Sequence, residues 1–284
     1  MFKRQLLWRT PEQLLEIGFQ RSPVVMMNEA HDRATRCIRT RQIGTHILPT
    51  AHQLGVRYLA MEALFPAYIE QAHQSRTLPD LKQIREVQWD HPQRKAWLQT
   101  FLSQGHSLLP EADYLGQPEM QALIQTALDL GWTLITYDID LLQRPSNLSE
   151  DEETNWREEV QARNLLTAFR ALPSGSRMLV WCGNSHLSKT VSRGSSSSVP
   201  WVPMGYQFKK ISGIDYFALD QIQTVLFPYS NSFRERLRNA YRSQLAEHGG
   251  TMGMLKEELP FRLKLQLGHF GCDAFLFSTD NALE

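Results

Sequence analysis

The sequence predicts an α/β fold, in which a largely parallel central sheet carries helices on both faces and a helical insertion or lid is added. Short apolar runs alternate with longer segments of helical periodicity, which is typical of βαβ units. The short runs are apolar at nearly every position, as expected for parallel strands buried on both faces. With 284 residues and 42% hydrophobic side chains, the chain is long enough to bury a core without a metal ion or a disulfide.

Six apolar runs are too short for helices and predict the strands of this sheet. In chain order they are residues 23–27, 56–61, 132–137, 178–182, 215–219 and 274–277. A helical stretch at 34–51 joins the first two runs, and together they form a βαβ unit. Within this stretch Gly44 is unfavourable for a helix, and Pro49 is expected to kink or divide it.

Helical periodicity recurs between the later strands. Apolar residues repeat on one face of residues 120–128, with Pro118 near the start of the helix and Gly131 just after its end. A polar, acidic loop at 144–155 leads into a further helix. The apolar face of that helix consists of Ala162, Leu165, Leu166 and Phe169.

A last helix is expected before the sixth strand, because apolar residues recur there at four-residue steps. These residues are Phe233, Leu237, Tyr241 and Leu245. Residues 65–117 are rich in Gln, Pro, His and Trp, and we interpret them as a helical insertion packed over the sheet. The whole chain, 1–284, is then a single α/β domain.

The charge balance and the cysteines exclude several classes of function. Lys and Arg number 30 and Asp and Glu number 30, so the formal net charge is zero, which disfavours nucleic-acid binding through bulk positive charge. Three cysteines without a CxxC motif indicate neither a disulfide framework nor a thiolate zinc site. Without an apolar leader or a run of about 20 apolar residues, the sequence predicts a cytoplasmic protein with no membrane span.

Polar side chains follow four of the predicted strands. The first strand leads into Glu29 and His31, the second ends at Glu62, the third ends at Asp138, and the fourth leads to His186. In open α/β sheets, ligands bind beyond the carboxyl ends of the strands. We therefore expect these side chains to meet at one edge of the sheet.

Two kinds of chemistry remain open for Glu29, His31, Glu62 and His186. A His–Glu pair can activate water as a general base, while a second histidine, with Asn184, protonates a leaving group or donates to an oxyanion. The same four side chains could instead bind a divalent metal such as Mn, Co or Zn. No GxSxG, GxGxxG or P-loop motif occurs, so serine-elbow, dinucleotide and P-loop chemistry have no support.

Three arginines recur at three-residue steps soon after His31: Arg33, Arg36 and Arg39. We expect this row to be a solvated helix face. The functional alternative is a rim that attracts the carboxylate or phosphate of a substrate. Cys182, within an apolar run, is expected to be a packing residue.

The polar segments and the strands before them resemble the superfamily of erythromycin esterase, ChaN and TIKI proteins. That group typically has a strand, a GE-x-H motif, a helix and a strand ending in Glu, then an R-x(n)-N helix before a strand that leads into (H/G)N-x-H. The similar segments here are 24–32, 55–62, 156–164 and 178–186, with a closing strand at 273–277. Asn28 replaces the usual Gly, and Gly183 stands where macrolide esterases usually have His, which counts against a macrolide substrate.

The resemblance implies an α/β fold with a shared polar site. In the esterases this site hydrolyses esters, in TIKI-type proteins it cleaves peptides with a metal, and ChaN-type members bind haem. By position, Glu29, His31, Glu62 and His186 would form the core of the site. Arg163 and Asn184 would support it.

We therefore expect a hydrolase that acts on an ester or related acyl bond of a small molecule. His31, oriented by Glu29 or Glu62, would activate water, and His186 would be the acid or oxyanion partner. The residues expected to bind substrate are Arg33, Asp138, Arg163 and Asn184. The alternative is a haem- or metal-binding protein without turnover.

Overall fold

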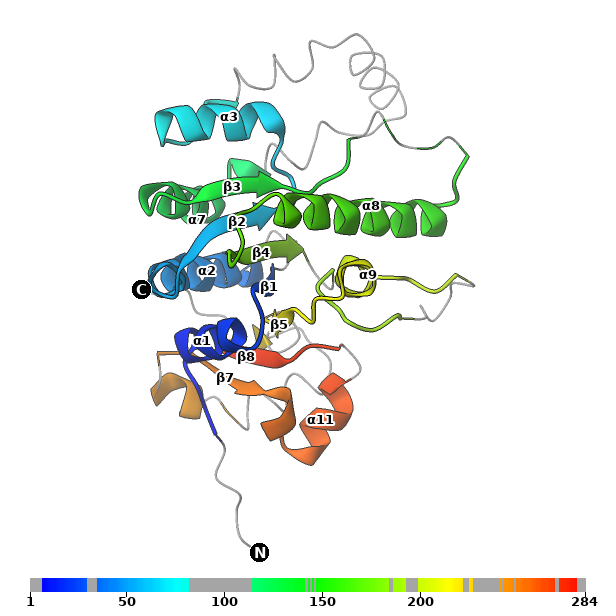
Figure 1. The fold of residues 1–284 in the computed structure, drawn as a ribbon. Coiled ribbons are helices and arrows are strands. Elements are labelled where there is room, and N and C mark those ends of the chain that lie inside the picture. The colour runs from blue at the N-terminus through cyan, green and yellow to red at the C-terminus, as the bar shows by residue number, and fades with distance from the viewer. Residues whose placement is uncertain are drawn as a thin grey trace, which may run out of the picture.

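The computed structural model contains an eight-stranded sheet that is parallel apart from one pair (Figure 1). It describes residues 7–29, 35–81, 114–140, 143, 145, 147–183, 186–192, 199–221, 225–226, 241, 243–247, 249–268 and 271–279. The strand order is β3-β2-β4-β1-β5-β8-β6, and β7 pairs with β8. Only the β7–β8 pairing is antiparallel among the described strands. The predicted α/β fold class is confirmed.

All six predicted strands are confirmed, with ends that differ by at most two residues. The strands are β1 (Val24–Glu29), β2 (Val56–Met61), β3 (Thr133–Thr136), β4 (Arg177–Gly183), β5 (Phe217–Asp220), β6 (Val225–Leu226), β7 (Thr251–Leu255) and β8 (Ala274–Thr279). The short β6 and the antiparallel β7 were not predicted. Strand β7 follows two glycines with positive φ and has Gly253 at its centre, where a Cβ atom would collide with Leu14.

Helices cover both faces of the sheet (Figure 1). They are α1 (Pro11–Arg21), α2 (Thr35–Gln53), α3 (Pro66–Ser75), α7 (Pro118–Asp129), α8 (Glu150–Arg170), α9 (Met204–Ser212) and α11 (Phe261–Leu267). A 3-10 turn, η2, spans Lys256–Glu258. None of the helices within the described ranges has both the length and the apolar character that crossing a bilayer would need.

Strand periodicity divides the apolar side chains between two cores. In β1, Val25 and Met27 pack in the core under α1, α2 and α7, whereas Val24 and Met26 pack in the core under α8, α9 and α11. Successive side chains of a strand point to opposite faces, so one apolar strand supplies both cores. This explains why every residue of β1 is buried.

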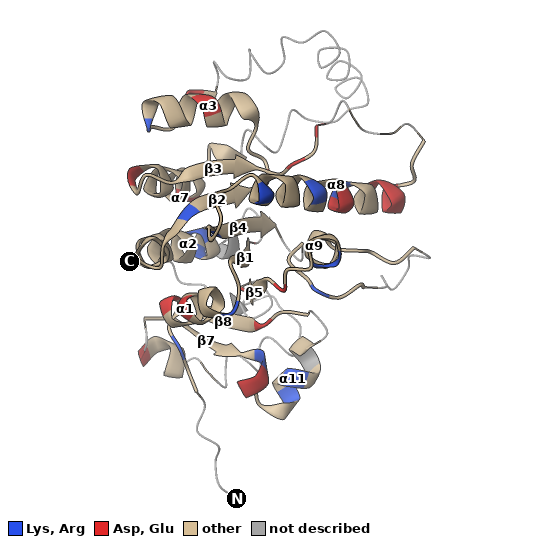
Figure 2. Cartoon of the chain, viewed as in Figure 1, with Lys and Arg blue, Asp and Glu red and all other residues tan. Residues whose placement is uncertain are grey.

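Helix α8 begins earlier than the sequence predicts. Residues 144–155 were expected to be a loop, but the helix starts at Glu150. Ser149 accepts from the backbone of Glu152, whose side chain accepts in return from the backbone of Ser149, so the two form a capping box. Acidic residues in the first turn also interact favourably with the helix dipole. Figure 2 shows acidic and basic residues close together along this helix.

Helix α2 continues through Pro49 as one element, so the expected division is wrong. Packing explains why a glycine occurs at position 44, inside this helix. A Cβ atom at Gly44 would collide with the indole ring of Trp181, so only glycine lets α2 lie this close to β4.

Gly44→Ala is expected to lower the free energy of unfolding by about 1–3 kcal/mol, the usual cost of overpacking a core. Helix propensity alone would give the opposite sign, since alanine is favoured over glycine by about 1 kcal/mol. Urea denaturation of both proteins measures the difference. A variant as stable as the wild type would show that Trp181 has room to move.

Two predicted segments lie partly outside the described residues. Of the insertion predicted at 65–117, α3 and residues 114–117 are described, while 82–113 lie outside. Of the helix expected around Tyr241, residues 241 and 243–247 are described as helical, and Leu245 is buried.

The expectation that Arg39 lies on a solvated helix face is wrong. Arg39 is 1% exposed, because its guanidinium points inward and donates to Thr251 of β7 and to the carbonyl of Gly249. Arg33 and the side chain of Arg36 lie outside the described part of the chain.

Candidate active site

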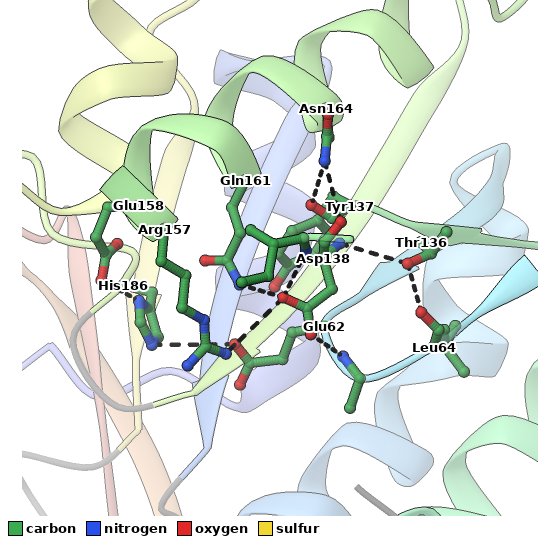
Figure 3. A network of polar contacts seen from close by, with 12 residues as sticks. Glu62, Leu64, Thr136, Tyr137, Asp138, Arg157, Glu158, Gln161, Asn164 and His186 are labelled. Carbon is green, nitrogen blue, oxygen red and sulfur yellow. Dashed lines mark hydrogen bonds and ion pairs between the residues drawn. The ribbon is translucent and has the colours of Figure 1, made fainter. Parts of the chain in front are cut away.

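The candidate active site lies where β2, β3 and β4 end and where α8 passes over them (Figure 3). Glu62 directly follows β2, and Asp138 follows β3 by two residues. His186 comes from the segment after β4. Helix α8 contributes Arg157 and Glu158 from the opposite side.

His186 is held between two carboxylates. Its Nδ1 lies 2.6 Å from Oε1 of Glu158, and its Nε2 lies 3.9 Å from Oε2 of Glu62. Glu158 is buried and also accepts from the indole N–H of Trp201 and the backbone N–H of Met204. The imidazole is therefore oriented by Glu158, with Nε2 directed toward Glu62.

The surroundings of His186 favour its charged form. Burial by itself lowers the pKa of His186, but the carboxylates of Glu158 and Glu62 outweigh burial and the guanidinium of Arg157, so the net shift is upward from 6.5. A raised pKa increases the fraction of imidazolium near neutral pH. His186 is therefore suited to give a proton from Nε2.

Arg157 adds a second cation to the site. One of its Nη atoms lies 3.9 Å from Oε2 of Glu62 and 3.9 Å from Oδ1 of Asp138. Burial lowers the pKa of Arg157, but Asp138, Glu62 and Glu158 outweigh it, and the net shift is upward. The side chain remains 43% exposed, so its charge is in contact with both solvent and site.

Asp138 fixes the turn that follows Glu62. It accepts from the backbone N–H of Ala63 (3.1 Å) and from Nε2 of Gln161 on α8 (2.8 Å). Ala63 has φ +64°, a left-handed conformation that costs free energy for a residue with a Cβ atom. Asn164 of α8 donates to the carbonyls of Tyr137 and Asp138. Asp138 thus couples the turn after β2 to α8.

Glu29, the last residue of β1, pairs with side chains of α2 and β4. Its carboxylate, fully buried, accepts from Nε of Arg41 (2.7 Å) and from the indole N–H of Trp181 (3.0 Å). The guanidinium of Arg41 also lies over the ring of Tyr114. Burial first, then the charges of Glu29 and Glu62, raise the pKa of Tyr114 well above its usual value. Glu29 is part of an internal ion pair.

The structure thus brings together Glu62, Asp138 and His186 of the residues singled out from the sequence. Arg163 is placed elsewhere: its side chain is 66% exposed and pairs with Glu159 on the outer side of α8. Arg157 is the arginine that reaches the site instead. His31, Arg33 and Asn184 lie outside the described residues.

Sequence reasoning missed Arg157, Glu158 and Gln161. A signal was present, because Glu158 and Gln161 precede the apolar face of α8 at helical spacing, and both are buried. A charged residue on the apolar face of a helix is costly unless it is paired. The pattern could therefore have marked Glu158 as a partner of a buried cation.

The described residues alone do not make up the predicted metal site. Among them no group of three or more His, Cys, Asp or Glu side chains could hold an ion. The guanidinium of Arg157 already places positive charge beside Glu62. A ligating imidazole has to be neutral, whereas the carboxylates raise the pKa of His186.

Comparisons with known proteins show the fold. No protein-family model matches the chain, and no curated protein sequence matches it. Among solved structures, a mutant of the erythromycin esterase EreC in its open conformation has a TM-score of 0.51, with 98% of each chain covered at 13% identity. At this identity the likeness shows a distant structural relationship and an α/β fold of the same kind.

Two further structures have lower TM-scores. ChaN of Campylobacter jejuni, a structure of cofacial haem binding, gives 0.47, with 94% of this chain and 91% of ChaN covered at 8% identity. RRSP, a MARTX toxin effector domain from Vibrio vulnificus, gives 0.44 at 14% identity, with 75% of this chain covered. The chain spans only 35–36% of RRSP and of two other structures of bacterial protein toxins.

Proposed function

We propose that the protein is a hydrolase that cleaves an ester or related acyl bond of a small molecule. The observation that carries this proposal is the orientation of His186, with Nδ1 against Glu158 and Nε2 directed toward Glu62. A histidine oriented by a carboxylate on one nitrogen is a common arrangement for proton transfer from the other. The fold shared with an erythromycin esterase supports the same class of reaction.

In this proposal, His31 takes a proton from water as the water oxygen attacks the acyl carbon. His186 gives its Nε2 proton to the leaving oxygen as the bond from that oxygen to the acyl carbon breaks. The products are a carboxylate and an alcohol. Glu62 is the carboxylate that orients the reacting groups, because Glu29 is engaged by Arg41 and Trp181.

Arg157 supplies positive charge at the point where negative charge develops on the acyl oxygen. Its guanidinium is held between Glu62 and Asp138 yet remains partly exposed, so a substrate oxygen can approach it. A preoriented donor of this kind stabilises the transition state more than the ground state.

Glu62→Gln and Glu159→Gln form a matched pair for testing this function. Both remove one negative charge, but Glu159 is 44% exposed and pairs with Arg163. With a panel of p-nitrophenyl and aliphatic carboxylic esters, we expect Glu159→Gln to hydrolyse like the wild type. Glu62→Gln is expected to lose about 10²-fold or more in kcat/KM.

Two results would contradict the proposal: no hydrolysis by the wild type above buffer, or full activity in Glu62→Gln. Haem titration and metal analysis of the same preparations address the alternative. Stoichiometric haem or metal with no turnover of any ester would favour a binding protein.

A further inference from the structure

A buried cation lies apart from the candidate active site. Arg39 of α2 is 1% exposed, and one of its Nη atoms donates to Oγ1 of Thr251 and to the carbonyl of Gly249 (3.3 Å). Its Nε is buried and has no hydrogen-bond partner among the described residues. Within the same residues, no carboxylate lies within ion-pair distance of Arg39.

A second buried donor lies opposite Thr251, the residue that this guanidinium contacts. Ser278 of β8 is directly opposite Thr251 of β7 in the antiparallel pair. Side chains of directly opposite residues lie on the same face, with Cβ atoms about 4.5–5.5 Å apart. Ser278 is 0% exposed, and its Oγ has no hydrogen-bond partner in the described part of the chain.

These groups lie on the face of the sheet that α1 and α2 cover. Leu276, two residues before Ser278, belongs to the core under these helices. The active-site candidates Glu62 and His186 contact α8 instead, and β8 is three strands away from β4 in the sheet order. Arg39, Thr251 and Ser278 therefore form a cluster that is separate from the candidate active site.

Two donors that are buried without an acceptor are costly, and so is a buried positive charge without a counter-ion. One anion would satisfy all three requirements. The flat guanidinium of arginine matches the oxygens of carboxylate and phosphate groups, and a hydroxyl beside it adds a further donor. Burial lowers the pKa of Arg39, as expected where no anion compensates the charge.

We propose that Arg39, Thr251 and Ser278 form a buried binding site for an oxyanion of the carboxylate or phosphate class. Nε of Arg39 and the hydroxyl of Ser278 donate to the oxygens of the anion. The hydroxyl of Thr251 holds the guanidinium in place. This site does not depend on the proposed hydrolase function.

Ser278→Ala is the sharpest test, because Oγ of Ser278 makes no contact that the described fold would lose. The midpoint of thermal unfolding, Tm, is measured in sodium phosphate, sodium acetate and sodium chloride at equal ionic strength. We expect phosphate, acetate or both to raise the Tm of the wild type above its value in chloride. In chloride, Ser278→Ala should match the wild type, and its affinity for the anion should be at least about tenfold weaker.

Arg163→Gln is the matched control for Arg39→Gln, since each variant removes one positive charge. The control should keep the anion-dependent rise in Tm, whereas Arg39→Gln should lose it. A rise in phosphate alone that Ser278→Ala diminishes assigns the site to phosphate groups, and such a rise in acetate alone assigns it to carboxylates. Equal Tm values in all three salts, or an undiminished rise in Ser278→Ala, would overturn the proposal.

Discussion

Replacing His186 by glutamine is expected to lower kcat/KM for ester hydrolysis by about 10²–10⁴-fold, the usual contribution of a general acid or base. Glutamine keeps a polar side chain of similar length but cannot give a proton to the leaving oxygen. The effect should be smaller for esters whose leaving group is acidic, such as p-nitrophenol, because these alcohols leave without protonation. An equal loss for acidic and aliphatic leaving groups would speak against the role of His186 as acid.

Ester hydrolysis is expected to decrease at high pH. In the proposed reaction His186 acts in its protonated form, so activity should fall as the pH rises through its pKa, which lies above 6.5. Glu158→Gln removes a carboxylate that raises this pKa and leaves burial, which lowers it. The descending limb of the kcat/KM profile should therefore move to lower pH. If the descending limb lies at the same pH in both proteins, it reports the titration of a group other than His186.

The stability of the fold depends on the same proton. Because the pKa of His186 is raised in the folded state, its stabilising contribution is fully present below pH 6.5. The contribution is lost as the pH rises through the folded-state pKa. Urea denaturation of wild type and His186→Gln across this range measures the difference without a substrate.

Arg41→Met is expected to lower the free energy of unfolding by about 3–5 kcal/mol, the usual cost of leaving one partner of a buried ion pair uncompensated. The side chains of Arg41 and Glu29 are 2% and 0% exposed, so the variant leaves the buried carboxyl group of Glu29 without this cation. Urea denaturation measures the loss. At the surface, Arg163→Met breaks a pair with Glu159 and should change stability by less than about 1 kcal/mol.

The double variant Glu29→Gln, Arg41→Met separates charge from packing. Removing the charge of Glu29 as well should restore part of the stability, because neutral side chains can replace a buried ion pair at little cost. A double variant less stable than Arg41→Met would show that Glu29 stabilises the fold mainly through Trp181.

Much of the fold is predictable because its strands are buried on both faces. Runs such as Val24 to Met27 have few alternatives to a parallel strand between helices. Strand β7 could not be found in this way, because its pattern contains Gly253 and its pairing to β8 depends on residues far away in sequence. The start of α8 was misplaced because its first turn is so acidic that it resembled a loop.

The candidate site is only partly predictable. Strand ends bring Glu62 and Asp138 to one edge, which the rule for parallel sheets anticipates. The rule does not say which partners a side chain finds at that edge, and it could not foresee that Glu29 pairs with Arg41 and Trp181. Nor does it identify the residues of the helix that crosses the edge, which supplies Arg157 and Glu158.

Four polar side chains extend from helix α8 toward the ends of β2 and β3, namely those of Arg157, Glu158, Gln161 and Asn164 (Figure 3). A shift of this helix along its axis by one turn, about 5.4 Å, would separate Glu158 from His186 and Arg157 from Glu62 at the same time. The two ion pairs of the candidate site therefore depend together on the position of this one helix.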